Sequence, residues 1–528
     1  MKILFLLTFT LSIAFGQKQI QVIPQPNEIS YGSGEYYVRK NIAIVALKEL
    51  SNEAEFLAEV LEKGFERKTK IRSNGKGIHL KLIPDENSLL GKEGYTMSVG
   101  KSGIEIAAGT PTGIFRGIQT FRQLLPVSFE FGGLEEKVAF PYVTISDKPQ
   151  FAWRAFMLDE SRHFQGVDQV KKMLDQMAYL KMNKFHWHLT DDQGWRIEIK
   201  KYPKLTEIGS VRKDTQVARR SEERTGVPHS GFYTQEEIKE IIEYATARHI
   251  TVIPEIEMPG HAIAAVAAYP WLGSLGTTNE VTVLFGKMEE SFNISDPKVI
   301  DFLKDVLDEV IALFPGQVVH VGGDEVNFGP WEKSPDTQAF MAKNGLKSPA
   351  DLQVYFTNQI SNYIDSKGKR MMGWNEIMGK EIHEERTSEA VEVQQKLAKS
   401  AIVHFWKGDL SLINQAVESG YDVVNSNHWD TYMDYTFGRL PLSKSYAFNP
   451  IPEGLDEKYH KHILGSGTQV WTEYLPTNES LEKQVFPRLA AYSEVGWTSV
   501  QNKDFERFTN SLELLKRKWS LEGIYFTN

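Results

Sequence analysis

Residues 318–326 have the sequence Val318-Val319-His320-Val321-Gly322-Gly323-Asp324-Glu325-Val326. The β-branched run at its start predicts a short buried strand, and residues 327–330 (Asn-Phe-Gly-Pro) would end the regular pattern. Gly322 and Gly323 have no Cβ, so the chain can bend there and another group can approach the backbone closely. The stretch therefore predicts two adjacent carboxyl groups at a strand end, where they could form a catalytic pair. A surface turn with two solvated carboxylates explains this stretch, taken alone, nearly as well.

The chain on both sides of this strand shows further strands that alternate with amphipathic helices, from residue 151 onward. Besides the central strand, the predicted strands are 155–158, 184–189, 250–256, 370–374, 401–406, 421–425 and 466–471. Helix starts are marked by a capping box, Thr234 with Glu237, and by Asp296-Pro297. Eight strands in a βα rhythm predict an α/β fold with a closed (β/α)8 TIM barrel, whose active groups should lie at the C-terminal strand ends.

The segment before the barrel has a different pattern. Residues 78–82 alternate as in a half-buried strand, 95–99 and 104–107 predict a hairpin, and apolar residues at helical spacing follow from Ile114 to Leu125. We therefore expect a small N-terminal α+β accessory domain at 17–148, the catalytic barrel at 149–500, and a C-terminal helical tail packed on the barrel at 501–528. No cluster of reactive residues marks the first domain, so its expected role is structural.

Composition restricts the classes of function. The chain has 528 residues, 41% of them hydrophobic, and can bury a large core. A formal net charge of -9 and a pI near 5.9 argue against a nucleic-acid-binding protein, because no basic patch dominates. The composition is that of an ordinary soluble globular protein.

The N-terminus predicts export. Residues 1–16 contain Lys2, an apolar run, and the small residues Ala14 and Gly16 before Gln17, as in a secretory signal peptide. The run is shorter than the roughly 20 apolar residues of a membrane span, and no later segment is apolar and long enough for one. The chain has no cysteine, so it forms no disulfide and carries no lipid-modified cysteine. These features predict a protein that is periplasmic or secreted after cleavage.

Polar and aromatic residues gather at the predicted strand ends. They are Arg162, His188, Asp191, Asp192, His261, His320, Asp324, Glu325, Trp374, Trp406, Tyr432, Asp434, Trp471 and Glu473. One hypothesis is a sugar pocket, in which indole and phenol rings form the wall and charged groups bind hydroxyls. The other is a metal-dependent barrel hydrolase that uses the histidines and Asp324 as ligands.

The two hypotheses use different residues. His186 and His188 alternate on one strand, share a face, and could chelate a metal with His261 and His320. Three tryptophans at strand ends favour the sugar pocket, because a metal site does not require them and the apolar face of a pyranose stacks on an indole. Each tryptophan alone could equally be barrel core; their shared position favours a site.

Four ordered blocks carry a resemblance to a known family. They are Met157-Leu158-Asp159-Glu160-Ser161-Arg162-His163-Phe164, the segment 186–196 (HWHLTDDQGWR), the segment 254–261 (PEIEMPGH) and the segment 320–325 (HVGGDE). In these blocks the chain resembles glycoside hydrolase family 20, the β-N-acetylhexosaminidases, over nearly all of its expected mature length. One departure is Glu257, where many members have aspartate.

The resemblance implies an exo-acting β-N-acetylhexosaminidase with a retaining, substrate-assisted mechanism, an exception to the usual two-carboxylate scheme. Glu325 would be the general acid and then the base, and Asp324 would hold the acetamide N–H and stabilise the oxazolinium ion. Asp191 and His261 would form a relay that orients Glu325. The implied binding residues are Arg162, Asp434 and Glu473 for hydroxyls, Tyr432 for the acetamide oxygen, and Trp374, Trp406 and Trp471 for the acetyl group and the ring.

The resemblance implies that the protein uses no cofactor and no metal. It also implies that the protein binds an oligosaccharide or glycoconjugate with a terminal N-acetylhexosamine. Alternatives remain for single residues and for the whole chain. Arg162 could be a structural ion-pair partner of Asp159, while His188 and His320 are expected to support the barrel through hydrogen bonds. The alternative functions are a metal-dependent deacetylase or amidohydrolase and a non-catalytic glycan-binding protein. The loop 211–230 is expected to shape outer subsites.

Overall fold

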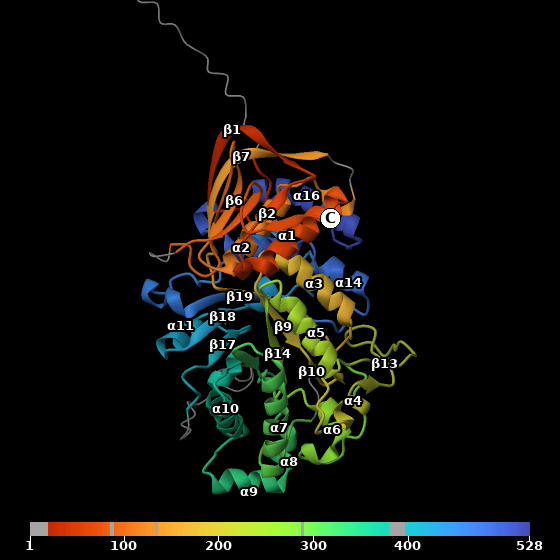
Figure 1. The fold of residues 1–528 in the computed structure, drawn as a ribbon. Coiled ribbons are helices and arrows are strands. Elements are labelled where there is room, and N and C mark those ends of the chain that lie inside the picture. The colour runs from red at the N-terminus through yellow and green to blue at the C-terminus, as the bar shows by residue number, and fades with distance from the viewer. Residues whose placement is uncertain (1–18, 85–88, 133–135, 287–289, 380–395) are drawn as a thin grey trace, which may run out of the picture. The chain divides into compact units, whose positions relative to one another are not determined.

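The computed structural model describes residues 19–84, 89–132, 136–286, 290–379 and 396–528, which form two compact units (Figure 1). The first comprises the chain up to Val22 together with Pro26–Asp147. The second comprises Lys148–Asn528 together with Ile23–Gln25. The predicted signal peptide lies outside the described residues.

The first unit is a mixed sheet with helices. Its strands are β1 (Glu28–Arg39), β2 (Ala43–Val45), β3 (Lys70–Arg72), β4 (Ile78–Leu82), β5 (Tyr95–Gly100), β6 (Gly103–Ala108) and β7 (Lys137–Asp147), and its helices are η1 (Lys48–Leu50), α1 (Ser51–Phe65), α2 (Pro111–Gln123) and η2 (Phe129–Phe131). Among the described residues the strand order is β1-β7-β5-β6-β4-β2-β3. The predicted strand at 78–82, the hairpin and the helix that follows are confirmed, so the α+β class is correct.

The second unit contains a closed parallel barrel. Its strands, in the part of the chain that is described, are β8 (Trp153–Asp159), β9 (Lys184–His188), β14 (Thr251–Glu255), β15 (Val318–His320), β16 (Arg370–Trp374), β17 (Ile402–Phe405), β18 (Asp422–Asn425) and β19 (Ile463–Val470). The barrel closes where β19 pairs in parallel with β8. Each strand overlaps one of the eight predicted from the sequence, so the (β/α)8 prediction is confirmed.

Helices cover the outside of the barrel, and Figure 1 shows several of them lying side by side. They are α3 (Val167–Tyr179), α5 (Gln235–Thr246), α7 (Pro297–Leu313), α10 (Pro349–Ser366), α11 (Ser411–Glu418), α14 (Asn478–Val485) and α15 (Arg488–Trp497). Between β16 and β17 the described residues contain only the turn η4 (Asn375–Met378), and 380–395 are not described. The predicted capping box of α5 is present, and Asp296 caps α7 by accepting from the Lys298 N–H.

The C-terminal segment forms η6 (Val500–Asn502) and α16 (Phe505–Glu522). Trp519 is fully buried, and its indole N–H donates to Gln176 of α3 at 2.9 Å. Trp519 also packs against Phe486, with ring centroids 4.8 Å apart. The contacts bring α16 onto the outer layer of the barrel unit.

Long connections follow the C-terminal ends of several strands. They contain β10 (Thr190–Asp191), β11 (Gly194–Trp195), α4 (Lys204–Glu207), β12 (Val211–Arg212), β13 (His229–Ser230), α6 (Ile263–Ala268), η3 (Pro270–Leu272), α8 (Gly329–Lys333), α9 (Pro335–Lys343), α12 (His428–Thr431), α13 (Leu442–Ala447) and η5 (Glu457–His462). In a (β/α)8 barrel this is the face that carries active sites. Within the described ranges, every helix is too short or too polar to cross a membrane.

The barrel interior changes character along the strands. One buried layer is apolar and is formed by Trp153, Ala155, Ile253, Val318, Met372, Ile402 and Val424. Two residues further along four of the same strands, the inward positions hold Glu255, His320, Trp374 and His404, all almost fully buried. Since alternate residues of a strand share a face, this second layer lies directly above the first, toward the C-terminal face. The barrel therefore encloses a layer of polar and aromatic side chains at its C-terminal strand ends.

Candidate active site

The two carboxyls that follow β15 are placed by a sharply bent backbone. Gly322 and Gly323 have φ of 64° and 97°, and Glu325, which is not glycine, has φ of 48°. A Cβ on Gly322 would lie 1.6 Å from Glu257 Oε2, so only glycine fits there. A left-handed conformation at Glu325 costs energy and is typical of functional sites. The predicted bend and close approach at the strand end are both present.

Asp324 is buried, with 9% of its surface exposed. Its Oδ2 lies 3.8 Å from His261 Nε2, while its Oδ1 is buried without a hydrogen-bond partner among the described residues. Burial raises the pKa of Asp324 to about 7, to which the charges of Glu325 and Glu255 contribute while His261 opposes them. A buried acceptor without a partner can receive an N–H from a bound molecule at little further desolvation cost.

His261 joins Asp324 to two more carboxylates. Its Nδ1 lies 3.1 Å from Asp191 Oδ1 and 3.1 Å from Asp192 Oδ2. Burial favours the neutral ring, but the two aspartates raise the pKa of His261 well above its ordinary value. The predicted pairing of Asp191 with His261 is therefore present in the structure. Of the two adjacent acids, His261 faces Asp324 in the structure. The predicted role of Asp191 and His261 in orienting Glu325 stays a prediction.

Arg162 is buried among acids at the same face. Its guanidinium lies 2.8 Å from Asp191 Oδ2 and 3.3 Å from Asp159 Oδ2, and its Nε donates to Gln193 Oε1 at 2.9 Å. It also lies 5.0 Å from the centre of the Trp471 ring. Arg162 is thus the ion-pair partner of Asp159 and, at the same time, a cation beside the aromatic wall.

The four predicted wall residues form one aromatic cluster. Trp374 lies 6.4 Å from Trp406 and 6.1 Å from Trp471, and Tyr432 lies 6.2 Å from Trp406 and 6.0 Å from Trp471, measured between ring centroids. The Trp374 Nε1 is buried with no hydrogen-bond partner in the described residues. Trp187, Trp195 and Trp497 are buried to the same degree as Trp374, and the Trp187 ring packs against Phe185, Tyr233 and Phe314 instead. The strand-end tryptophans are therefore distinguished by their mutual contact.

Asp434 and Glu473 lie close enough to influence each other. Burial raises the pKa of Asp434 to about 7, with a further contribution from the charge of Glu473. Burial likewise raises the pKa of Glu473, while Arg162 opposes that shift. Asp434 Oδ1 has no hydrogen-bond partner within the described ranges. These two carboxyls and Arg162 form a polar end of the site, suited to binding hydroxyl groups.

Glu376 belongs to this site and was not predicted from the sequence. The Trp406 indole N–H faces both of its oxygens, at 3.1 and 3.0 Å. Burial raises the pKa of Glu376 to about 8, and the charge of Asp324 adds to the shift. The available signal was its place two residues beyond a predicted strand end, directly after Trp374-Asn375. Glu376 fixes Trp406 and thereby one side of the aromatic wall.

Glu376→Gln is expected to stabilise the protein at alkaline pH. The folded-state pKa of Glu376 lies above the unfolded value, so folded protein keeps a proton that unfolded chain has lost, and stability falls as pH rises from about 4.5 to about 8. Glutamine loses no proton and can still accept from Trp406. The melting temperature of the variant should match wild type near pH 4.5 and exceed it above about pH 8. An equal difference at both pH values would contradict this assignment.

The histidine cluster below the site lies at hydrogen-bond distances. Glu255 lies 2.8 Å from His186 Nε2, 2.7 Å from His188 Nδ1 and 2.8 Å from His320 Nδ1. Donors around tetrahedral zinc, at about 2.0–2.1 Å from the ion, lie roughly 3.3 Å from one another. The imidazoles thus contact Glu255 directly and lie closer to it than metal ligands lie to one another, and the supporting role expected for His188 and His320 matches this geometry better than metal ligation.

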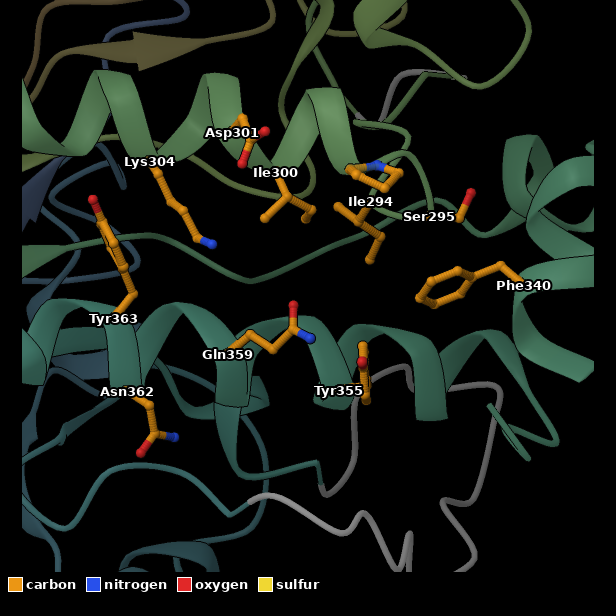
Figure 2. A pocket seen from close by; sticks show the side chains of 11 residues that line it. Ile294, Ser295, Ile300, Asp301, Lys304, Phe340, Tyr355, Gln359, Asn362 and Tyr363 are labelled. Carbon is orange, nitrogen blue, oxygen red and sulfur yellow. The ribbon is translucent and has the colours of Figure 1, made fainter. Parts of the chain in front are cut away.

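A hollow elsewhere on the barrel contains none of the predicted site residues. It has a volume of about 490 Å³ and lies on the outer side, between α7 and α10. Figure 2 shows Lys304 and Gln359 pointing into it from the two facing helices, with Phe340 at one end. It has no adjacent carboxyl pair and no indole, so the strand-end cluster is the better candidate for catalysis.

Comparison with known proteins gives matches over both units. The sequence model described as "Glycosyl hydrolase family 20, catalytic domain" matches residues 151–500, and that of "Glycosyl hydrolase family 20, domain 2" matches residues 19–148. These ranges contain all the strands of the barrel and of the N-terminal sheet, respectively.

Individual relatives agree with these matches. A β-hexosaminidase of Porphyromonas gingivalis is 37% identical over 527 residues, which cover 96% of this chain and 64% of the relative. A β-hexosaminidase of Vibrio furnissii is 32% identical, covering 90% of this chain and 76% of the relative. An exo β-N-acetylglucosaminidase of Vibrio harveyi, solved with N-acetylglucosamine, has a TM-score of 0.83 at 30% identity, covering 96% of this chain and 78% of that one. The chain thus spans less than two thirds of the Porphyromonas protein.

Proposed function

This chain belongs to glycosyl hydrolase family 20, and from that premise we propose that it is an exo-acting β-N-acetylhexosaminidase. Its substrates are oligosaccharides or glycoconjugates that end in β-linked N-acetylglucosamine or N-acetylgalactosamine at the non-reducing end. The observation that carries this proposal is the buried, unpartnered Asp324 Oδ1 on the same face as the aromatic cluster. An acetamide group has the N–H that this oxygen lacks and a methyl group that fits among indole rings.

The proposed reaction uses the substrate's own amide as nucleophile. The acetamide oxygen attacks the anomeric carbon while Glu325 donates a proton to the glycosidic oxygen, so the C–O bond breaks and the alcohol leaves. Asp324 accepts the acetamide N–H and balances the positive charge of the oxazolinium ion. Glu325, now a carboxylate, takes a proton from water, which opens the ring at the anomeric carbon and gives the retained sugar.

The remaining predicted residues have roles in binding. Tyr432 donates to the acetamide oxygen, and Trp374, Trp406 and Trp471 enclose the acetyl group and stack on the sugar. Support for this grouping comes from the centroid separations of 6.0–6.4 Å across the cluster. Indole and phenol rings contribute dispersion and exclude water, which strengthens the electrostatic interactions of the acids.

The polar end of the site binds the ring hydroxyls. Arg162 donates to the 3- and 4-hydroxyls, and Asp434 and Glu473 accept from the outer hydroxyls. Buried carboxyls with raised pKa values, as at Asp434, are sites where bound hydroxyls replace missing partners. Asp191 and His261 orient the acid pair.

A panel of nitrophenyl β-glycosides that differ at the 2-substituent tests the proposed function. The 2-acetamido compounds should be cleaved, and the plain β-glucoside should be inert, because it lacks the internal nucleophile. A chelator should leave the rate unchanged. Hydrolysis of the plain glucoside at a similar rate would contradict neighbouring-group participation, and loss of activity with chelator would favour the metal-dependent alternative.

We also propose that the protein is exported to the periplasm or the medium. The proposal is supported by the sequence of residues 1–16, a short apolar run after Lys2 that ends in small residues. Mass spectrometry of the protein recovered from the producing cells should find Gln17 at the mature N-terminus. An intact N-terminus on cytoplasmic protein would contradict export.

A further inference from the structure

Glu255 is a buried carboxylate that the proposed reaction does not use. It is the last residue of β14 and fully enclosed in the barrel. Its Oε2 lies 2.8 Å from His186 Nε2 and 2.7 Å from His188 Nδ1, and its Oε1 lies 2.8 Å from His320 Nδ1. Despite its burial, the three imidazoles hold the pKa of Glu255 well below its usual range. A fixed negative charge therefore lies at the centre of the barrel.

His188 lies between this carboxylate and a second one. Its Nδ1 faces Glu255 Oε2 at 2.7 Å, and its Nε2 faces Asp191 Oδ2 at 2.9 Å. An ionised carboxylate only accepts hydrogen bonds, so both ring nitrogens must carry protons. The ring is then an imidazolium. Burial works against the charge, but Glu255 and Asp191 raise the pKa of His188 well above its ordinary value.

The other groups around His188 are a carboxyl, an aromatic ring and the Arg162 guanidinium, which shares Asp191 Oδ2 with it. Glu257 Oε1 lies 4.0 Å from its Nδ1, and the Trp471 ring meets it edge-on with centroids 5.0 Å apart. A third carboxyl close to Nδ1 is compatible with a cation at this position. Arg162 is the cation among these groups, and Asp191 lies between it and the imidazolium.

Asp191 connects His188 to the two adjacent acids through His261. Its Oδ2 accepts from His188 and Arg162, at 2.9 and 2.8 Å, while its Oδ1 accepts the Asp192 backbone N–H at 2.7 Å and faces His261 Nδ1 at 3.1 Å. His261 Nε2 in turn faces Asp324 Oδ2 at 3.8 Å. We propose that Glu255 and His188 are positioning residues: a permanent imidazolium, held between Glu255 and Asp191, fixes Asp191 and His261 and so keeps Asp324 oriented.

The physical reason is the pairing of buried charges. If His188 held one proton, one of its nitrogens would present a lone pair to a carboxylate, and the repulsion would displace Glu255 or Asp191. Breaking a buried pair by removing one partner leaves an uncompensated charge, which is strongly unfavourable. The consequence for catalysis rests on the proposed function, whereas the protonation of His188 does not.

Neutron diffraction of the full-length, deuterium-exchanged protein at about pH 8 tests the charge directly, above the ordinary pKa of histidine. Deuterium should occupy both Nδ1 and Nε2 of His188. Occupancy of one nitrogen only would overturn the proposal. This measurement needs no substrate, so its failure is distinguishable from failure of the proposed enzyme activity.

Kinetics of Glu255→Gln test the positioning. The variant removes the charge at constant shape, and kcat should fall by roughly 100-fold with little change in KM, as expected when a reacting group is displaced. The loss should be equal for substrates with poor and with activated leaving groups, because Asp324 acts on both. The matched control is His163→Asn: His163 is a buried histidine whose Nδ1 contacts only the Thr472 carbonyl, at 2.6 Å.

The control should keep wild-type kcat. A folded Glu255→Gln with wild-type kcat, or with a change in KM alone, would overturn the positioning role. Should Glu255→Gln fail to fold, His188→Asn, which removes the cation and leaves Glu255 with His186 and His320, takes its place with the same expected loss and the same contrary outcome.

Discussion

Asp324→Ala should lower kcat/KM on 2-acetamido substrates by roughly 1,000-fold, through loss of both the orientation of the internal nucleophile and the charge opposite the oxazolinium ion. The expectation rests on the buried, unpartnered Oδ1 of Asp324 and on its contact with His261. The measurement is steady-state kinetics on an aryl 2-acetamido glycoside. A rate near wild type would remove Asp324 from the mechanism.

Asp324→Asn separates the two contributions. The amide has nearly the shape of the carboxylate and can still accept the acetamide N–H, but it carries no charge. Its kcat/KM should therefore lie between those of wild type and Asp324→Ala. If Asp324→Asn were as slow as Asp324→Ala, the whole loss of kcat/KM would be due to the missing negative charge.

The pH profile provides an independent check on Asp324. Burial raises its pKa to about 7, and the proposed role requires the ionised form, so wild-type kcat/KM should fall as pH decreases through about 7. Asp324→Asn should lose that acidic limb. Stability changes in the opposite sense: the folded pKa exceeds the unfolded one, so ionisation costs stability as pH rises, and the asparagine variant should be at least as stable as wild type near pH 8. Unfolding is then excluded as the cause of lost activity.

The barrel could be predicted because its local patterns agree with its tertiary structure. In α5, the capping box and the apolar positions Ile238, Ile241 and Ile242 are local signals, and the same residues are buried in the fold. Even β15, only three residues long, was predicted from its β-branched start. Parallel strands buried on both faces appear as apolar runs, so their order along the chain was sufficient for the (β/α)8 fold.

Contacts between strand ends were harder to predict. The Glu376–Trp406 hydrogen bond joins residues 30 positions apart, and it exists because β16 and β17 are neighbours in register. The position of Glu376 just beyond a predicted strand end was the only local signal, and it does not reveal the contact with Trp406. Glu255 likewise lies in an apolar strand, and its three histidine partners come from β9 and β15. Such contacts follow from barrel geometry, which local periodicity does not contain.

The sequence also did not predict which charged side chains contact one another. Arg162 contacts Asp159 and Asp191 together, so the ion pair with Asp159 is present, while the binding of sugar hydroxyls stays a prediction. The resemblance implied that His261 and Asp191 pair and orient Glu325, whereas in the structure the far nitrogen of His261 faces Asp324 at 3.8 Å. The two glycines predicted that the chain bends at residues 322–325, but the direction in which the side chains then point depends on the actual dihedral angles, which residue types do not specify.

Glu325→Gln should show a loss that depends on the leaving group. For an alkyl or sugar leaving group, which needs a proton in the transition state, we expect kcat/KM to fall by roughly 1,000-fold. For a dinitrophenyl leaving group, which departs as a stable anion, the loss should be less than about tenfold. The structural basis is a half-buried carboxyl in a left-handed backbone conformation next to Asp324. The measurement is a plot of log kcat/KM against the pKa of the leaving group for wild type and for Glu325→Gln. The variant should give the steeper slope.

The Asp324 and Glu325 variants together distinguish nucleophile support from acid catalysis. Loss of Asp324 slows formation of the C–O bond to the acetamide whatever group departs, so Asp324→Ala should lower both substrates by a similar factor. Loss of Glu325 removes only the proton that the poor leaving group needs. If Glu325→Gln lowered both substrates equally, Glu325 would have no role as the acid, and the donor would have to be another carboxyl of the site. Glu376, which burial keeps protonated up to about pH 8, would be the first candidate. The same leaving-group series would then be measured on Glu376→Gln.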